Sequence, residues 1–156
     1  MRHLIFSLLV FISFSNASAQ KIENNNFSYE EDVTFTIKRF NNSKTTQYGN
    51  GTDNRVYIAQ GARFKTAWIE ISNNTKEDKE INFETFYLID SQGKKYHVHI
   101  VVQSGKMGTT VERYKQQLKA GKERLFFAEF WPPYPKNEKI ESMEVNGKII
   151  KLKEVE

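Results

Sequence analysis

Apolar and polar side chains alternate along several short segments of the chain, with the period of two that is typical of half-buried β-strands. The clearest example is Val33, Phe35 and Ile37, which alternate with threonine and lysine. The same alternation predicts further strands at residues 55–60, 62–72, 81–90 and 95–102. We therefore expect a domain built mainly of short strands.

Residues 123–131 differ from the other segments because both faces of this strand are apolar. One face carries Leu125, Phe127 and Trp131, and the other carries Phe126, Ala128 and Phe130. Such a strand is expected to be central in its sheet and covered on both sides. We accordingly predict that Phe127 lies in the core.

Between residues 105 and 121 the apolar period changes to that of a helix. Three apolar residues fall on one helical face: Val111, Tyr114 and Leu118. Thr109 and Glu112 have the spacing of a capping box, and Gly121 is placed to end the helix. The pattern predicts one short helix in an otherwise all-β chain.

Turn residues separate the predicted strands. Residues 41–54 read as a long polar loop, in which Tyr48 is the one large apolar residue. Asn146-Gly147 is the strongest hairpin signal of the chain. The predicted fold class is all-β: an immunoglobulin-like β-sandwich of about seven or eight strands with one short helix.

The first nineteen residues have the pattern of a signal peptide. Arg2 and His3 precede an apolar run at residues 4–14, and Ala17 and Ala19 supply the small side chains of a cleavage site before Gln20. The apolar run is too short to span a bilayer. We expect an exported protein, periplasmic or extracellular, with a flexible lead-in at residues 20–31 and one domain at residues 32–156.

Composition narrows the classes of function. The chain has no cysteine, which excludes disulfides, thiolate metal sites and a lipid-modified cysteine. Lys and Arg number 23 against 19 Asp and Glu, with the two signs mixed along the chain, so a nucleic-acid partner is not expected. Residues 20–156 contain no apolar run long enough for a transmembrane segment.

Three sequence motifs carry a resemblance to a known family. They are W-I-E-I-S-N-N-T at residues 68–75, F-Y-L-I-D-S-Q-G-K-K-Y at residues 86–96, and L-K-A-G at residues 118–121 before an apolar strand. Together they resemble an immunoglobulin-like domain family of unknown function found in exported bacterial proteins and lipoproteins. The resemblance covers roughly residues 63–130 and implies a fold without assigning catalytic residues. The chain departs from the family at Ala120, where proline is usual, in its extra helix and in lacking a lipid-modified cysteine.

His97 and His99 are the only histidines beyond the predicted signal peptide, and their spacing places both on one face of a strand. A metal site would need further ligands, for which Asp90, Glu84 or Met107 would have to approach. We expect two surface histidines, no metal and no cofactor. Neither a nucleophile-elbow motif nor a glycine-rich phosphate loop is present, so we do not expect an enzyme.

All three prolines of the chain lie at residues 131–135, together with Trp131 and Tyr134. This segment either closes one end of the sandwich or presents a stiff aromatic platform to a ligand. We take Trp131 and Tyr134 as the candidate binding residues, with Tyr134 the more exposed of the two.

The expected function is that of an exported, non-enzymatic module that binds an unknown envelope protein or glycan. The alternative is a small periplasmic inhibitor or immunity-type protein, and a third option is a metal-handling protein that uses His97 and His99.

Overall fold

The computed structural model of the chain describes residues 20–21, 23, 26–49, 54–105, 110–111 and 113–153. Within these residues the chain is almost entirely β, as the alternation predicts. Fourteen strands are present: β1 (Gln20–Lys21), β2 (Asn26–Glu30), β3 (Val33–Ser43), β4 (Thr45–Gly49), β5 (Asn54–Ile58), β6 (Ala62–Asn73), β7 (Lys79–Asn82), β8 (Phe86–Ile89), β9 (Lys95–Gln103), β10 (Thr110–Val111), β11 (Lys115–Leu118), β12 (Glu123–Pro135), β13 (Ser142–Val145) and β14 (Lys148–Lys151). The number exceeds the expected seven or eight because several strands are very short.

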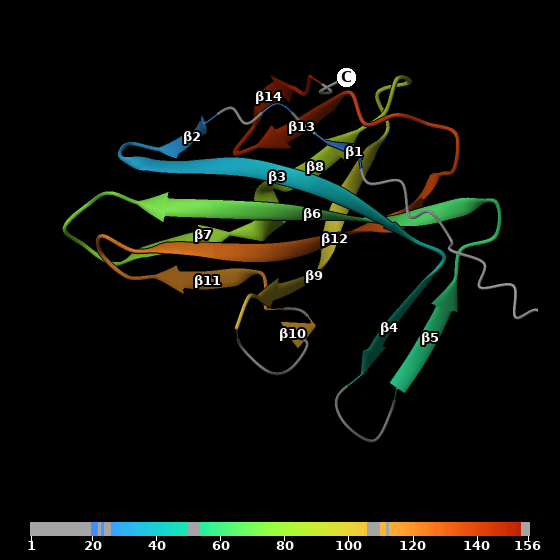
Figure 1. The fold of residues 1–156 in the computed structure, drawn as a ribbon, viewed down its shortest axis with the longest axis horizontal. Helices are drawn as coiled ribbons and strands as arrows, with labels where there is room; N and C mark the ends of the chain where they lie inside the picture. Colours follow the sequence, from blue (N-terminus) through green and yellow to red (C-terminus); the bar gives the residue numbers. More distant parts are fainter. Residues whose placement is uncertain are drawn as a thin grey trace, which may run out of the picture.

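Ten of these strands form one continuous sheet in the order β1-β3-β6-β12-β9-β8-β13-β14, with β2 paired to β3 and β10 paired to β9. Every pairing is antiparallel, including those in the two small sheets β11-β7 and β4-β5. Figure 1 shows β3, β6 and β12 side by side across the molecule, with β8 passing behind them and β13 and β14 at the top of the view. The sheet therefore folds back on itself as a β-sandwich.

Strand β9 connects the two layers. Its first residues pair with β8 and its later residues pair with β12. The register with β12 shifts where Val98 and Ile100 pair with consecutive residues, which leaves His99 as the extra residue of a bulge. Bulges bend a strand and increase its twist, so this bulge lies where the sheet turns from one layer into the other.

The core fills the space between the two layers. Ile37, Ile69 and Phe126 contribute from the front layer and Leu88 and Met143 from the back layer, and each has an exposed fraction of 0%. Along β12 the buried residues alternate with partly exposed ones. Strand β12 is central, between β6 and β9, as its apolar sequence predicts. The expected cover on both faces is only partial, however, because Phe126 lies in the core whereas Phe127 is only partly buried.

The predicted helix at residues 105–121 is wrong. Residues 110–111 form β10 against β9, and residues 115–118 form β11 against β7. Leu118 is buried, and Tyr114 is partly buried against the same core. The Tyr114 carbonyl accepts a hydrogen bond from the backbone N–H of Phe83 at 2.9 Å. Hydrogen bonds to neighbouring strands satisfy the backbone groups of this segment, so tertiary pairing overrides the helical spacing of its apolar residues. Thr109 and Glu112 lie outside the described residues.

The one helix within the described residues is a short 3₁₀ turn, η1 (Phe83–Thr85). Asn82 caps it, because its side-chain oxygen accepts a hydrogen bond from the Glu84 N–H at 3.0 Å. Phe83 is fully buried against Phe126, with 5.2 Å between the ring centroids. The turn therefore contributes a large side chain to the core.

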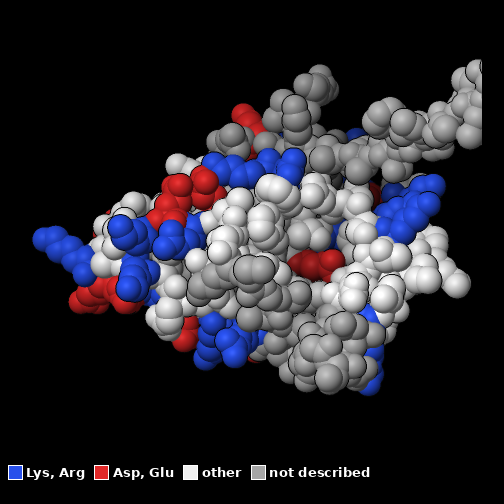
Figure 2. Space-filling view, turned by 60° about the horizontal axis from the view of Figure 1, so that its bottom comes forward, with Lys and Arg blue, Asp and Glu red and all other residues white. Residues whose placement is uncertain are grey.

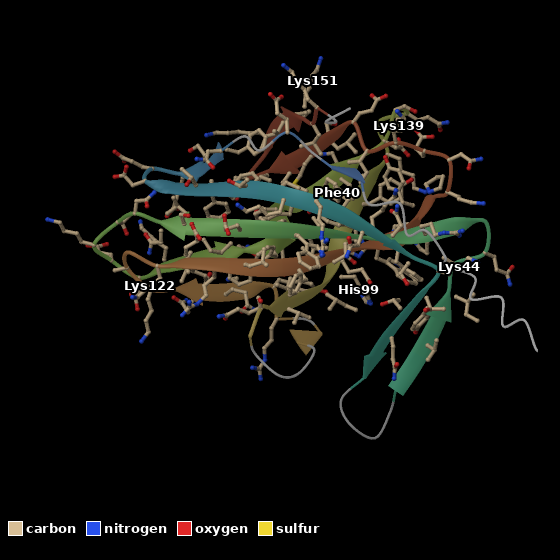
Figure 3. The ribbon with its side chains drawn as sticks, viewed as in Figure 1. Phe40, Lys44, His99, Lys122, Lys139 and Lys151 are labelled. Atoms are coloured by element: carbon tan, nitrogen blue, oxygen red, sulfur yellow. The ribbon has the colours of Figure 1, made fainter. Side chains whose placement is uncertain are left out.

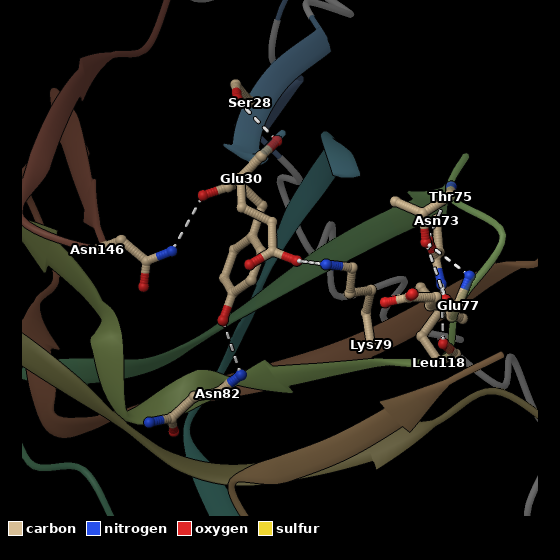
Figure 4. Close-up of polar contacts among 10 residues, drawn as sticks. Ser28, Glu30, Asn73, Thr75, Glu77, Lys79, Asn82, Leu118 and Asn146 are labelled. Atoms are coloured by element: carbon tan, nitrogen blue, oxygen red, sulfur yellow. Dashed lines mark hydrogen bonds and ion pairs between the residues drawn. The ribbon is translucent and has the colours of Figure 1, made fainter. Parts of the chain in front are cut away.

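The folded domain begins before Asp32, where the sequence placed its start. Strand β2 pairs with β3, and Tyr29 is buried. Figure 4 shows the polar contacts of this strand: the Asn82 N–H donates to the Tyr29 hydroxyl at 2.9 Å, and Lys79 pairs with Glu30 at 3.3 Å. Part of the expected flexible lead-in is thus a strand of the sheet. The predicted signal peptide, residues 1–19, lies outside the described residues.

The motifs that carry the family resemblance have structural roles. Asn73 is buried at the end of β6, and its amide donates to the carbonyls of Glu77 at 2.8 Å and Leu118 at 3.0 Å (Figure 4). Asp90 follows β8, and its carboxylate accepts hydrogen bonds from the backbone N–H groups of Gln92 and Lys94 and from the Tyr96 hydroxyl. Both side chains stabilise turns, because they form hydrogen bonds with backbone groups that would otherwise lack a partner.

The predicted Asn146-Gly147 hairpin joins β13 to β14. Both turn residues have positive φ, 50° for Asn146 and 76° for Gly147, as a tight two-residue hairpin turn requires. Strand β14 forms one edge of the large sheet, and its Ile149 is 65% exposed. Among the described residues, no helix has the length and apolar character needed to cross a membrane.

Candidate functional site

Residues 41–54, which the sequence marks as a polar loop, mostly form strands. Strand β3 continues to Ser43, and β4 then pairs with β5 as a separate hairpin. The N–H of Ala59 donates to the Lys44 carbonyl at 2.8 Å and closes the base of this hairpin. Figure 1 shows the hairpin projecting from the body of the sandwich. Residues 50–53 and the side chain of Tyr48 lie outside the described residues.

The two faces of the β4-β5 hairpin have different surroundings. Thr46 and Tyr57 are directly opposite each other, with Thr46 buried and Tyr57 partly buried. On the other face Val56 is 60% exposed and Ile58 is 70% exposed. The hairpin therefore packs one face on the domain and presents aliphatic side chains to solvent on the other.

The side chain that the hairpin meets is Trp131 of β12. Its ring centroid lies 5.5 Å from that of Tyr57, 5.7 Å from that of Phe64 and 5.3 Å from that of His99. In Figure 3 the labelled His99 lies between β12 and the hairpin. Four rings from β5, β6, β9 and β12 therefore meet on the outer face of the front layer, outside the main core.

A second pair of rings lies on the same outer face. Trp68 of β6 and Phe127 of β12 are cross-strand partners whose ring centroids are 4.6 Å apart in an edge-to-face arrangement. The guanidinium group of Arg39 lies 3.5 Å from the centre of the Trp68 ring, a favourable cation–π position. We call Tyr57, Trp68, Phe127 and Trp131 the aromatic face.

Glu129 lies on β12 between Phe127 and Trp131 and points to the same side of the strand. Burial raises the pKa of its carboxyl group, and a hydrogen bond with Thr46 of the hairpin offsets only part of that rise. Its Oε1 atom is buried and accepts no hydrogen bond in the structure. Figure 2 shows acidic atoms in a recess near the centre of the view, bordered in part by uncharged residues.

The Glu129→Gln variant should have a higher melting temperature than the wild type at pH 8. A carboxyl group with a raised pKa stabilises the fold below its unfolded pKa of about 4.3, and this contribution is lost as the pH rises through the folded pKa. Glutamine has nearly the same shape and cannot ionise. Thermal unfolding at pH 4 and pH 8 measures the effect, and an equal change at both values would contradict the assigned burial.

The structure separates the two candidate binding residues. Tyr134 is only 1% exposed, its hydroxyl donates to the Lys139 carbonyl at 2.8 Å, and its ring lies 4.5 Å from that of Tyr96. The expectation that Tyr134 is the exposed contact is therefore wrong. Trp131 is partly exposed on the outer face. The residues between them bulge out of the ladder with β6, and the Trp131–Pro132 peptide bond is cis.

The two histidines also have different surroundings. His97 is exposed, whereas His99 is partly buried against Trp131 because of the bulge in β9. Asp90, named as a possible further ligand, is engaged in the β8-β9 turn. Within the ranges that the structure describes, no group of three His, Asp or Glu side chains could hold a metal ion.

The sequence did not single out the hairpin residues Thr46, Val56, Tyr57 and Ile58 as part of a site, nor Arg39, Trp68 and Glu129. The apolar side chains on both faces of β12 did indicate that other elements would pack against each face of this strand. The outer face is only partly covered, and the β4-β5 hairpin covers it. The sequence pattern of β4 had indicated a loop. Glu129 was hidden because an isolated acidic residue in an apolar strand has no motif.

Comparisons with known proteins bear on the fold. No family model matches the chain, and no curated protein matches it. Among solved structures, an uncharacterised β-sandwich protein from Clostridium difficile 630 is similar over 85% of this chain and 91% of its own, with 14% identity and a TM-score of 0.55. A functionally unknown protein from Listeria monocytogenes EGD-e matches 81% of this chain and 71% of its own, with 16% identity and a TM-score of 0.47. The first of these likenesses agrees with the β-sandwich seen in the structure, and it concerns the fold alone.

Proposed function

We propose that this protein is an exported, non-enzymatic module that binds a protein or glycan of the bacterial envelope through the aromatic face and the β4-β5 hairpin. The observation that carries the proposal is the aliphatic pair Val56 and Ile58, 60% and 70% exposed on a hairpin that borders partly exposed aromatic rings. The signal-peptide pattern of residues 1–19 supports export.

The chemistry of this surface favours binding. Aromatic side chains offer a large contact area and lose little conformational entropy on docking. Trp131 is held between Phe64 and Tyr57, so its orientation is fixed before a partner arrives. Exposed apolar residues beside such rings are typical of the contact regions of proteins.

The proposal predicts that a Val56→Ser/Ile58→Ser double variant captures its envelope partner at least tenfold less efficiently than the wild type. Both side chains point to solvent, so their loss removes contact area from the hairpin without opening a cavity in the core. Pull-down from an envelope extract, quantified by mass spectrometry over a range of bait concentrations, measures the change.

The matched control is Ile149→Ser. Ile149 is exposed to a similar extent, at 65%, but lies on the edge strand β14. Capture should be unchanged in this variant, and melting temperatures should agree among all three proteins. Equal capture by the double variant and the wild type would remove the hairpin from the binding surface.

The inhibitor or immunity-type alternative is favoured by the shape of the hairpin, which projects from the sandwich with two apolar side chains on one face (Figure 1). Such a hairpin suits insertion into a cleft of a partner protein. Protease treatment of the extract before the pull-down separates the two ideas. Capture that survives proteolysis indicates a glycan and contradicts the inhibitor.

A further inference from the structure

Glu129 is the one acidic side chain of the described residues on the strand segment that carries the aromatic face. Phe127 and Trp131 precede and follow it on the same side of β12, and its cross-strand partners are Thr66 and Ile100. Tyr57, which contacts Trp131, approaches from the hairpin. A carboxylate is thus surrounded by rings and small or aliphatic side chains.

No basic side chain of the described residues compensates this carboxylate. The influences on its pKa are burial and the hydrogen bond with Thr46, without a contribution from a cation. The guanidinium group of Arg39 is stacked on the Trp68 ring of β6. Glu129 therefore retains an unused hydrogen-bond acceptor, Oε1, in a poorly hydrated place.

A half-buried carboxylate of this kind is costly unless a cation or hydrogen-bond donor reaches it. Aromatic rings attract organic cations through their negatively polarised faces. A primary ammonium group meets both conditions, because it carries a positive charge and donates hydrogen bonds. We propose that Glu129, together with Trp131 and Tyr57, forms a subsite for a primary alkylammonium group.

Entry of the ammonium group requires a displacement of the hairpin. Strands β4 and β5 pair only with each other within the described sheets. The Thr46 hydrogen bond and the contact between Tyr57 and Trp131 hold the hairpin over Glu129. The ammonium group then donates to Oε1, the carboxylate oxygen that accepts no hydrogen bond, and the rings flank it.

The inference rests on the proposed function, since it names the chemical group that the aromatic face receives. Such a group has two natural sources: the side chain of a lysine on a partner protein, or an amino sugar of a glycan. Both present a primary ammonium group on a short carbon framework. Binding of a simple primary ammonium compound is measured first, and compounds that represent lysine and an amino sugar are compared afterwards.

Tryptophan fluorescence is a local probe here because the chain has two tryptophans, Trp68 and Trp131, and both lie on the aromatic face. Titration with n-butylammonium should give a saturable change in emission. We expect n-butanol, which lacks the charge, and tetramethylammonium, which lacks the N–H donors, to bind at least tenfold more weakly.

The Glu129→Gln variant should bind n-butylammonium at least tenfold more weakly than the wild type. Glu70→Gln is the control, because Glu70 lies on the same face but forms an ion pair with Lys38, and its affinity for the probe should be unchanged. Equal affinity of the Glu129→Gln variant and the wild type would overturn the proposal. So would equal affinity for tetramethylammonium.

The sources are separated with Nα-acetyl-lysine N-methylamide and glucosamine, each compared with its N-acetylated counterpart. Tighter binding of the lysine derivative indicates a protein partner, and tighter binding of glucosamine indicates a glycan. Different experimental results would contradict the ammonium subsite and the proposed binding function. Loss of capture by the hairpin variant without any butylammonium binding leaves the function standing and removes the subsite.

Discussion

Truncation of Phe126 to alanine should lower the free energy of unfolding by about 3–5 kcal/mol. Phe126 is fully buried on the central strand β12, and its ring lies 5.2 Å from that of Phe83. The truncation removes apolar contacts and leaves a cavity between the two layers, where the antiparallel ladders on both sides of β12 resist collapse. Urea denaturation followed by circular dichroism measures the loss.

The adjacent residue provides the control. Phe127 points to the outer face, is partly exposed and contacts Trp68. Its truncation should cost less than about 2 kcal/mol, because solvent and neighbouring side chains fill part of the vacated space. If both variants lose the same stability, the assignment of inner and outer faces on β12 is wrong.

Replacement of Asp90 by alanine should cost about 2–4 kcal/mol at pH 7, since three hydrogen bonds to a charged acceptor disappear together. The groups left without this acceptor are the N–H groups of Gln92 and Lys94 and the hydroxyl of Tyr96, at 3.0, 2.8 and 2.9 Å. The Tyr96 hydroxyl is buried and has to lose its partner inside the fold. Chemical denaturation at several pH values tests this prediction.

The pH dependence identifies the mechanism. Burial raises the pKa of Asp90, but the hydrogen bonds from Lys94, Tyr96 and Gln92 outweigh it and hold the pKa below its usual value. The stabilisation is therefore present above the unfolded pKa of about 3.9 and is lost as the pH falls through the folded pKa. The difference between the wild type and the Asp90→Ala variant should shrink at low pH.

Tyr96→Phe separates the hydroxyl from the backbone contacts. It removes one hydrogen bond and keeps the ring, so we expect a loss of about 1 kcal/mol. A loss equal to that of Asp90→Ala would mean that the turn between β8 and β9 depends on the hydroxyl alone.

The sequence predicted the strands and the sandwich because period-two alternation reports burial on one face directly. It also predicted the central place of β12 and the turn at Asn146-Gly147, both of which the structure confirms. These features depend on local patterns that tertiary contacts reinforce.

Prediction failed where the pattern was ambiguous. Residues 105–121 have apolar residues at helical spacing, but pairing of β11 with β7 decided their conformation. Both faces of β12 are apolar in sequence, so Phe127 was expected in the core although its face is only partly covered, and Tyr134 was expected to be exposed although it is buried. Strand β4 was missed because threonine and glutamine in a hairpin above a sheet resemble a polar loop.

The topology of the sheet has a consequence for how the chain folds. Strand β12 pairs with β6, and Ser72 and Glu123, which join these strands by a hydrogen bond, are 51 residues apart in the sequence. Strand β3 likewise pairs with β6 across the inserted hairpin. Domains dominated by such distant pairings close large loops before they gain stability, and they fold in milliseconds to seconds. Refolding of this domain, followed after dilution from denaturant, should therefore fall in that slow range.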